Sequence, residues 1–259
     1  MDDARERGTA IVRAFSVLDA IVGDVRCVSL AEIVAAVGLP KPTVHRLLSQ
    51  LESAGIVQRE PEGKRFAGGA RLTQFALQVL MSSTARGARH AILRRLVDEL
   101  GETCNFTMLE GAQVVYLDRV ETPAPLRMNL QAGSRVPIHC TASGKLLLAM
   151  LPKAKRERLV ASLSLMRHTD RTITDRRRLG RELEKIRAQH YSTDDEEFHP
   201  GLACVAVPIR DPSGRTCAAL AMHAPVSRMS LERQVEHLSS LRRAANEIGR
   251  TFRDEWEPR

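Results

Sequence analysis

Apolar residues recur every three to four positions in two neighbouring stretches near the start of the chain. The first stretch carries Leu30, Ile33, Val34 and Val37 at this spacing. The second stretch repeats it with Val44, Leu47, Leu48 and Leu51. Residues three and four apart share one face of a helix, so the pattern predicts two short amphipathic helices that face a common core.

The ends of these helices are marked by residues with a defined backbone role. Ser29 and Glu32 fit a capping box, in which each side chain accepts a hydrogen bond from a free amide at the helix start. Gly38 suits the left-handed residue that ends a helix. Pro42 suits the first turn of the next helix, because its missing N–H had no partner there. With Gly55 after the second stretch, the signals predict a helix-turn-helix over 29–55.

The outer face of the second helix is polar and contains no carboxylate. Its members are Lys41, Thr43, His45, Arg46, Ser49, Gln50 and Ser53. Such side chains contact phosphates and base edges, so this helix is suited to the major groove of DNA. A helical hairpin with a solvated outer face is the alternative.

The flanking sequence favours the DNA-binding interpretation. One side of an earlier helix is predicted to complete a three-helix core with Ile11, Phe15, Leu18 and Val22. Residues 56–59 and 64–66 enclose a turn-like segment over 60–63, which predicts a small basic β-hairpin, or wing. Three helices followed by a wing predict a winged helix-turn-helix domain over residues 1–69.

A linker helix is predicted next, over residues 70–84. Its apolar stripe consists of Leu72, Phe75, Ala76, Val79 and Leu80. Packing of this stripe against a second copy would form a dimer that matches two half-sites on DNA. Packing against its own domain is the alternative.

Helix and strand patterns alternate over residues 85–259. Helices are predicted over 91–100, from Thr141 onward, and over 153–160, 175–189 and 231–252. The stripe of the last helix is Leu231, Val235, Leu238, Leu241, Ala245, Ile248 and Phe252. Strands are predicted over 103–109, 113–120, 126–131, 202–209 and 216–223. The nearly continuous apolar run 202–209 predicts a strand buried on both faces. We expect an α+β domain with helices packed on an antiparallel sheet.

The net charge of +8 changes this picture little. Residues 1–80 hold ten Lys and Arg against nine Asp and Glu, whereas residues 153–187 hold twelve against five. The basic excess therefore predicts solvated helix faces in the second domain, and the DNA prediction rests on the local pattern. An aromatic content of 3% argues against a single-strand binder built on stacking platforms.

The cysteines and the chain start indicate a reduced, cytoplasmic protein. The five cysteines are scattered and form no C-x-x-C pair, which argues against a disulfide framework and a zinc ribbon. The first eight residues are charged and no apolar run is long enough to cross a membrane, so we expect neither a signal peptide nor a membrane segment.

Four stretches of the chain resemble IclR-type transcriptional regulators. They are LPKPTVHRLLSQLESAG, GETCNFTMLEGAQVVYLDRVE, VPIHCTASGKLLLAMLP and DDEEFHPGLACVAVPIRDPSGRTCAALAMHAP, in the family's order between about Thr9 and Phe252. The resemblance implies a winged helix, a linker helix and a C-terminal effector-binding and oligomerisation domain of GAF-like fold. It also implies a homodimer or homotetramer whose binding to a double-stranded operator is controlled by a small organic acid. Repression is the commoner role in the family, and activation of an aromatic or keto-acid catabolic operon is the alternative.

Two sets of DNA contacts follow from the predicted docking. Base-edge or phosphate contacts are expected from Thr43, His45, Arg46 and Gln50. Phosphate contacts are expected from Lys41, Lys64 and Arg65.

A predicted effector site centres on residues 141–145. They are small and open a helix after a loop, so the first backbone amides are accessible to an anion such as a carboxylate. An ordinary helix capped by Thr141 or Ser143 is the alternative. By the resemblance, the pocket is lined by Ala142, Ser143, Asp194, Cys204, Ala221 and His223.

His223 and Ala221 set the expected polarity of this pocket. Some members of the family carry serine at both positions, so the polar end of the pocket is altered here. His223 is expected either to hydrogen-bond a ligand, with a pH-sensitive charge, or to be a satisfied core histidine.

The acidic run 194–197 is predicted to form an exposed turn, with Asp194 turned inward by the resemblance. The chain has no G-x-S-x-G elbow and no H-E-x-x-H metal spacing. We therefore expect no catalytic residue, no metal and no cofactor, and a protein that is not an enzyme.

Overall fold

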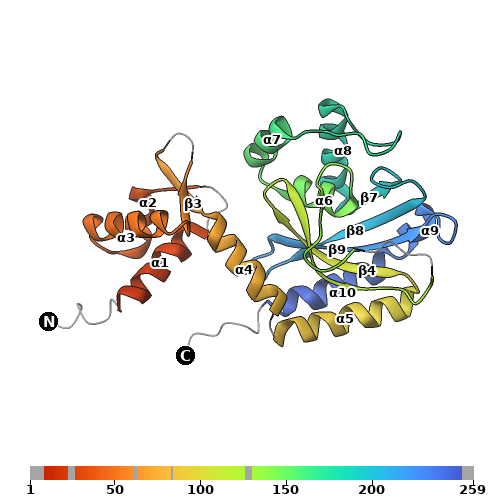
Figure 1. The fold of residues 1–259 in the computed structure, drawn as a ribbon, viewed down its shortest axis with the longest axis horizontal. Helices are drawn as coiled ribbons and strands as arrows, with labels where there is room; N and C mark the ends of the chain where they lie inside the picture. The colour runs from red at the N-terminus through yellow and green to blue at the C-terminus, as the bar shows by residue number, and fades with distance from the viewer. Residues whose placement is uncertain (1–8, 23–26, 61–62, 83, 126–129, 253–259) are drawn as a thin grey trace. The chain divides into compact units, whose positions relative to one another are not determined.

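The computed structural model describes residues 9–22, 27–60, 63–82, 84–125 and 130–252. The chain consists of two compact units (Figure 1). The boundary between them falls between Val79 and Leu80, inside the predicted linker helix. Among the described residues, no helix combines the length and apolar character that crossing a membrane requires.

The N-terminal unit is a three-helix core with a small sheet. Its helices are α1 (Ala10–Val22), α2 (Leu30–Val37), α3 (Lys41–Ser53) and the start of α4 (Ala70–Ser82). Its strands are β1 (Val28–Ser29), β2 (Val57–Arg59) and β3 (Arg65–Gly68). The antiparallel sheet has the order β1-β3-β2, and Arg59 of β2 pairs with Phe66 of β3. The predicted winged helix-turn-helix is confirmed, with β1 as a strand that the sequence did not indicate.

The residues at the helix ends adopt the conformations and hydrogen bonds that the sequence predicted. The Ser29 hydroxyl accepts from the Glu32 amide at 3.3 Å, and the Glu32 carboxylate accepts from the Ser29 amide at 2.7 Å. Gly38 adopts a φ of 64°, which is the left-handed helix end. Pro42 lies in the first turn of α3. These caps fix the angle at which α3 leaves the turn.

The predicted buried face of α1 is wrong. Val17 and Ile21 are the buried residues of this helix, and Leu18 is half-buried. Ile11 is 70% exposed, Phe15 60% and Val22 53%. Apolar residues occupy more than one face of α1, so periodicity alone placed the core on the wrong side.

The C-terminal unit is built on a six-stranded antiparallel sheet of order β6-β5-β4-β9-β8-β7. Its strands are β4 (Thr103–Glu110), β5 (Gln113–Val120), β6 (Arg135–Pro137), β7 (Ser192–Asp195), β8 (Leu202–Arg210) and β9 (Thr216–Pro225). Its helices are α5 (Thr84–Leu100), α6 (Ala142–Met150), α7 (Lys153–Ser162), α8 (Arg176–Gln189), α9 (Leu231–Glu236) and α10 (Leu238–Arg250).

Helices cover both faces of this sheet. Helices α6 and α8 lie on one face, and α5 and α10 lie on the other (Figure 1). Strand β8 is buried on both sides, as its apolar run predicted. The expected α+β architecture with a helix-covered antiparallel sheet is confirmed.

Several boundaries differ from the sequence prediction. The expected long final helix is interrupted at His237, which separates α9 from α10. The predicted strand over 126–131 falls mostly outside the described residues, and its described end is irregular. Helix α5 starts at Thr84, seven residues earlier than expected.

Candidate functional site

Helix α3 presents the polar face that the sequence predicted. Its core side is buried through Val44, Leu47, Leu48 and Leu51. Lys41, His45, Arg46 and Gln50 are exposed, and Thr43 is half-buried. Ser49 and Ser53 donate their hydroxyls to carbonyls of their own helix, at 3.0 Å and 2.8 Å. The groups left to meet a ligand are therefore the basic and amide side chains.

The wing arginines are engaged within the domain. Arg65 donates to the Cys27 carbonyl at 3.0 Å and to the Glu32 carboxylate at 3.3 Å. Arg59 forms an ion pair with Glu52 at 3.0 Å and lies 4.7 Å from the centre of the Phe66 ring. These pairs fasten the wing to α2 and α3. Lys64 is exposed next to them.

In the second unit, the predicted effector residues surround one cavity. All six line it, from the N-terminus of α6 and from strands β7, β8 and β9: Ala142, Ser143, Asp194, Cys204, Ala221 and His223. Six further residues complete the lining, namely Asn105, Tyr116, Val136, Thr141, Phe198 and Leu202. The sequence alone did not single out these further residues as pocket residues, except Thr141.

The register of the sheet explains this convergence. Asp194 on β7 pairs with Cys204 on β8, and Cys204 pairs with His223 on β9. Asn105 on β4 pairs with Ala221 on β9. Paired residues direct their side chains to the same face of a sheet, so residues far apart in the chain share one surface beneath α6.

The N-terminus of α6 forms the opposite wall. The Thr141 hydroxyl accepts from the Gly144 amide at 3.2 Å and donates to the Pro137 carbonyl at 2.7 Å. The expected cap is therefore Thr141. A helix has no intrahelical partner for its first amides, and Ala142 and Ser143 of this first turn line the cavity. This wall favours a negative group.

His223 offers the cavity a hydrogen-bond donor. Its side chain is buried, and its Nδ1 lies 3.2 Å from the Asn105 amide nitrogen. With that amide donating, the ring proton sits on Nε2. The Nε2 atom and the Asn105 Oδ1 atom are buried without a hydrogen-bond partner in the described part of the chain. A ligand with an oxygen acceptor for the Nε2 proton and a hydroxyl donor for the Asn105 Oδ1 atom would supply partners for both.

The expected pH-sensitive charge of His223 is wrong, because the surroundings of the imidazole keep it neutral. Burial, together with nearby Arg119, lowers the pKa of His223 to about 3. The imidazole is therefore neutral at physiological pH, where it acts as a hydrogen-bond donor and acceptor and not as a cation.

The acidic run is not a simple exposed turn. Asp194 and Glu197 are buried, whereas Asp195 and Glu196 are partly exposed. Asp194 accepts from the amides of Glu197 at 2.7 Å and Phe198 at 3.3 Å. Glu197 forms a buried ion pair with Lys145 of α6. The alternation of β7 turns Asp194 inward, and the bend after the strand turns Glu197 inward.

Burial raises the pKa of Asp194 to about 7, against the lowering effect of Lys145. A folded-state pKa above the ordinary value of 3.8 means that the native state holds a proton which the unfolded chain releases. Stability of the domain therefore falls as the pH rises from about 4 to about 7.

Asp194→Asn is expected to remove this dependence. The variant should be more stable than the parent at pH 8, by about 1–4 kcal/mol, and the difference should shrink toward pH 5. Thermal melting of both proteins across this range tests it, with exposed Asp98→Asn as the control. An Asp194→Asn difference that does not vary with pH contradicts a buried, proton-holding Asp194.

The cavity is small as the structure stands, at about 20 Å³, which is room for about one water molecule. A wider hollow of about 850 Å³ lies on the surface between α8 and β7, with charged side chains such as Arg178, Arg181 and Glu182. All six predicted effector residues line the small cavity, and none of them lines the wider hollow.

Comparison with known proteins matches both units. Residues 10–61 match the IclR helix-turn-helix domain, and residues 77–250 match the bacterial transcriptional regulator IclR C-terminal domain. The chain belongs to the IclR family of transcriptional regulators. The predicted family is thereby confirmed, and the relatives named below are transcriptional regulators.

Three IclR-family proteins illustrate the similarity. The chain is 50% identical over 243 residues to the probable transcriptional regulator SauR of Cupriavidus necator, covering 94% of this chain and 96% of that one. It is 31% identical over 241 residues to the transcriptional repressor IclR of Escherichia coli, covering 92% and 88%. A crystal structure of an IclR homologue complexed with 4-hydroxybenzoate, from Microbacterium hydrocarbonoxydans, has a TM-score of 0.60 and 26% identity, covering 95% of this chain and 100% of that one.

Proposed function

We propose that this regulator represses transcription by binding a double-stranded DNA operator, and that a small organic acid in the C-terminal cavity controls this binding. The observation that carries the proposal is the presence of two features in one chain. One is the polar outer face of α3, where the carboxylate of Glu52 is paired with Arg59. The other is a buried cavity with polar groups that lack partners in the described part of the chain. Activation of a catabolic operon is the second candidate mode. Because the target is DNA, the protein acts in the cytoplasm.

Docking of α3 in the major groove assigns roles to the polar side chains of this helix. Thr43, His45, Arg46 and Gln50 face base edges or phosphates in this arrangement. Lys41 and Lys64 contact phosphates. Arg65 was expected to do the same, but its bonds to Cys27 and Glu32 favour a supporting role for the wing.

Arg46→Ala is expected to weaken operator binding by about 1–3 kcal/mol, roughly 10- to 100-fold, because it removes a charged donor at the groove. Arg46 is exposed, so the fold should be unchanged. Binding is measured by fluorescence anisotropy at fixed salt, with exposed Arg94→Ala on α5 as the charge-matched control. Equal affinity of Arg46→Ala and the control would rule out this docking.

The polar groups on the cavity walls support an organic acid as the effector. A carboxylate fits the first amides of α6, and a second ligand oxygen fits the Nε2 proton of His223. The 4-hydroxybenzoate bound to the Microbacterium homologue supports an acid of this kind. The acid must displace side chains to enter, because the cavity holds only about one water molecule.

A homodimer or homotetramer is also part of the proposal. Phe75 is 62% exposed and Val79 46% exposed on α4, and α1 exposes Ile11 and Phe15. Apolar surface of this kind favours burial against a second copy, and two copies match two operator half-sites.

A gel-shift and footprint on the DNA upstream of the protein's own gene tests the function. It is run at fixed salt, with and without a panel of keto, hydroxy and aromatic acids. A competitor-resistant footprint that one acid shifts supports the proposal. Diffuse binding that salt removes, and that no acid alters, contradicts it.

A further inference from the structure

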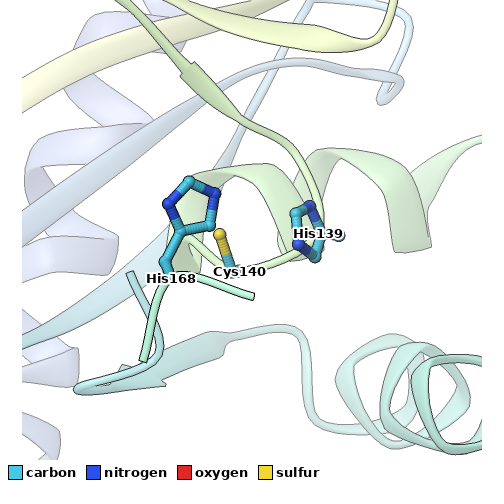
Figure 2. Close-up of side chains that lie close together, drawn as sticks. All are labelled: His139, Cys140 and His168. Carbon is cyan, nitrogen blue, oxygen red and sulfur yellow. The ribbon is translucent and has the colours of Figure 1, made fainter. Parts of the chain in front are cut away.

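Three side chains with metal-ligating atoms converge beside the effector cavity. His139 and Cys140 stand just before α6, and His168 lies between α7 and α8 (Figure 2). One ligand atom from each residue lies within 4.8 Å of the other two. No local pattern indicates this cluster, because His168 lies 28 positions after Cys140 and 29 after His139, and no familiar ligand spacing is present.

The cluster is shielded from solvent. His139 is 3% exposed and Cys140 is fully buried. His168 is half-buried, but its Nε2 atom is buried and finds no hydrogen-bond partner among the described residues. Figure 2 shows the Cys140 sulfur between the two imidazole rings. A buried imidazole nitrogen next to a thiol, with no partner, lacks an interaction that a metal ion would supply.

One ring nitrogen of His139, Nε2, already has a hydrogen-bond partner. Its Nε2 lies 2.9 Å from the Met166 carbonyl oxygen, so Nε2 carries the proton and donates it. The Nδ1 atom is then the nitrogen with a free lone pair. Metal-binding histidines commonly hold their other N–H on a backbone carbonyl, which fixes the tautomer and the ring orientation.

A buried carboxylate oxygen at the start of α6 also lacks a partner. Glu197 pairs with Lys145 of α6. Its second oxygen, Oε2, is buried and lacks a hydrogen-bond partner in the residues that the structure describes.

We propose that His139, Cys140 and His168 bind one zinc ion per chain. Zinc accepts both imidazole and thiolate ligands, at about 2.0–2.1 Å and 2.3 Å, so its ligand atoms stand roughly 3.3–3.7 Å apart. The three atoms must therefore close by about 1 Å. On binding, the Cys140 thiol loses its proton to solvent and the thiolate sulfur forms the bond to zinc.

Zinc at this place would also fix one wall of the effector cavity. The His168 ring lies 5.3 Å from the Phe198 ring, edge to face, and Phe198 lines the cavity. Cys140 is followed directly by Thr141, the cap of α6. The ion would tie the segment before α8 to the start of α6. This structural role goes beyond operator binding and effector control.

Cobalt is the probe for the first test. Untagged full-length protein is freed of metal with a chelator and titrated with Co²⁺ alone. We expect the absorption of tetrahedral cobalt and a thiolate-to-cobalt charge-transfer band, both saturating at one ion per chain. One equivalent of Zn²⁺ should remove both signals. The absence of a charge-transfer band in the parent protein overturns the proposal.

Variants then assign the ligands. Cys140→Ser should lose the charge-transfer band, and His168→Asn should weaken Zn²⁺ binding by at least about 10-fold. Cys217→Ser and His190→Asn are the matched controls and should bind as the parent does, because both residues lie outside the cluster. Circular dichroism checks each fold, and His168→Asn decides the matter if Cys140→Ser fails to fold. Unchanged binding in His168→Asn overturns the proposal.

Discussion

Gly144→Ala is expected to destabilise the C-terminal domain by about 3 kcal/mol. An added Cβ would lie 2.4 Å from the Ile138 carbonyl oxygen, 2.6 Å from the Ile138 Cα and 2.6 Å from the Thr141 hydroxyl. Two of these atoms belong to the backbone, so neither a rotamer change nor a small adjustment relieves the contact. The start of α6 should move away from the preceding bend.

Gly180→Ala provides the matched control. Gly180 lies within α8, and an added Cβ there meets no atom within 4 Å. Alanine at this helical position should stabilise the protein by up to about 1 kcal/mol. Calorimetry of the full chain gives the melting temperatures, and hydrogen exchange of the peptide containing α6 localises the effect. Equal melting temperatures for the two variants would contradict the close approach at Gly144.

Lys145→Met is expected to cost about 3–5 kcal/mol, because it leaves Glu197 buried without its cation. Lys145 is 1% exposed, and its ammonium group pairs with a Glu197 side chain that is 9% exposed. Methionine keeps most of the volume, so the loss is chiefly electrostatic. Burial already raises the pKa of Glu197, so protonation should recover part of the loss below neutral pH.

The double variant Lys145→Met with Glu197→Gln distinguishes the interaction within the ion pair from the interactions of each side chain with its surroundings. It should be more stable than Lys145→Met alone, because no buried charge remains without a partner. Urea unfolding of the parent, both single variants and the double variant gives the coupling energy. Additive single effects would show that the two side chains do not act as a pair.

The sequence predicted the N-terminal domain well because its signals are local. The capping box of Ser29 and Glu32, the left-handed Gly38 and the stripe of α3 each lie within a few residues. The error at α1 has a different origin. Ile11 and Phe15 are as apolar as Val17 and Ile21, and only the positions of α2 and α3 decide which face is buried.

The six residues that the family resemblance assigns to an effector pocket line one cavity, and no local pattern indicated them. Asn105, Tyr116 and Phe198 join it only because the sheet register and the bend after β7 bring them there. The inward turn of Glu197 depends on Lys145, which is 52 residues away in the chain. Likewise, the short strands β1, β6 and β7 have two to four residues each, too few for a periodic pattern.

The small cavity has a consequence for the rate of signalling. The organic acid of the proposed function is too large for a space of about 20 Å³. If such an acid binds there, the walls must open before or during association. The observed association rate should then level off at high acid concentration, at the rate constant of the opening step. Four of the six predicted lining residues stand on β7, β8 and β9, whereas Phe198 stands on the bend between β7 and β8. If the proposed acid binds in this cavity, the time course of induction would be set by the opening of its walls rather than by diffusion of the acid.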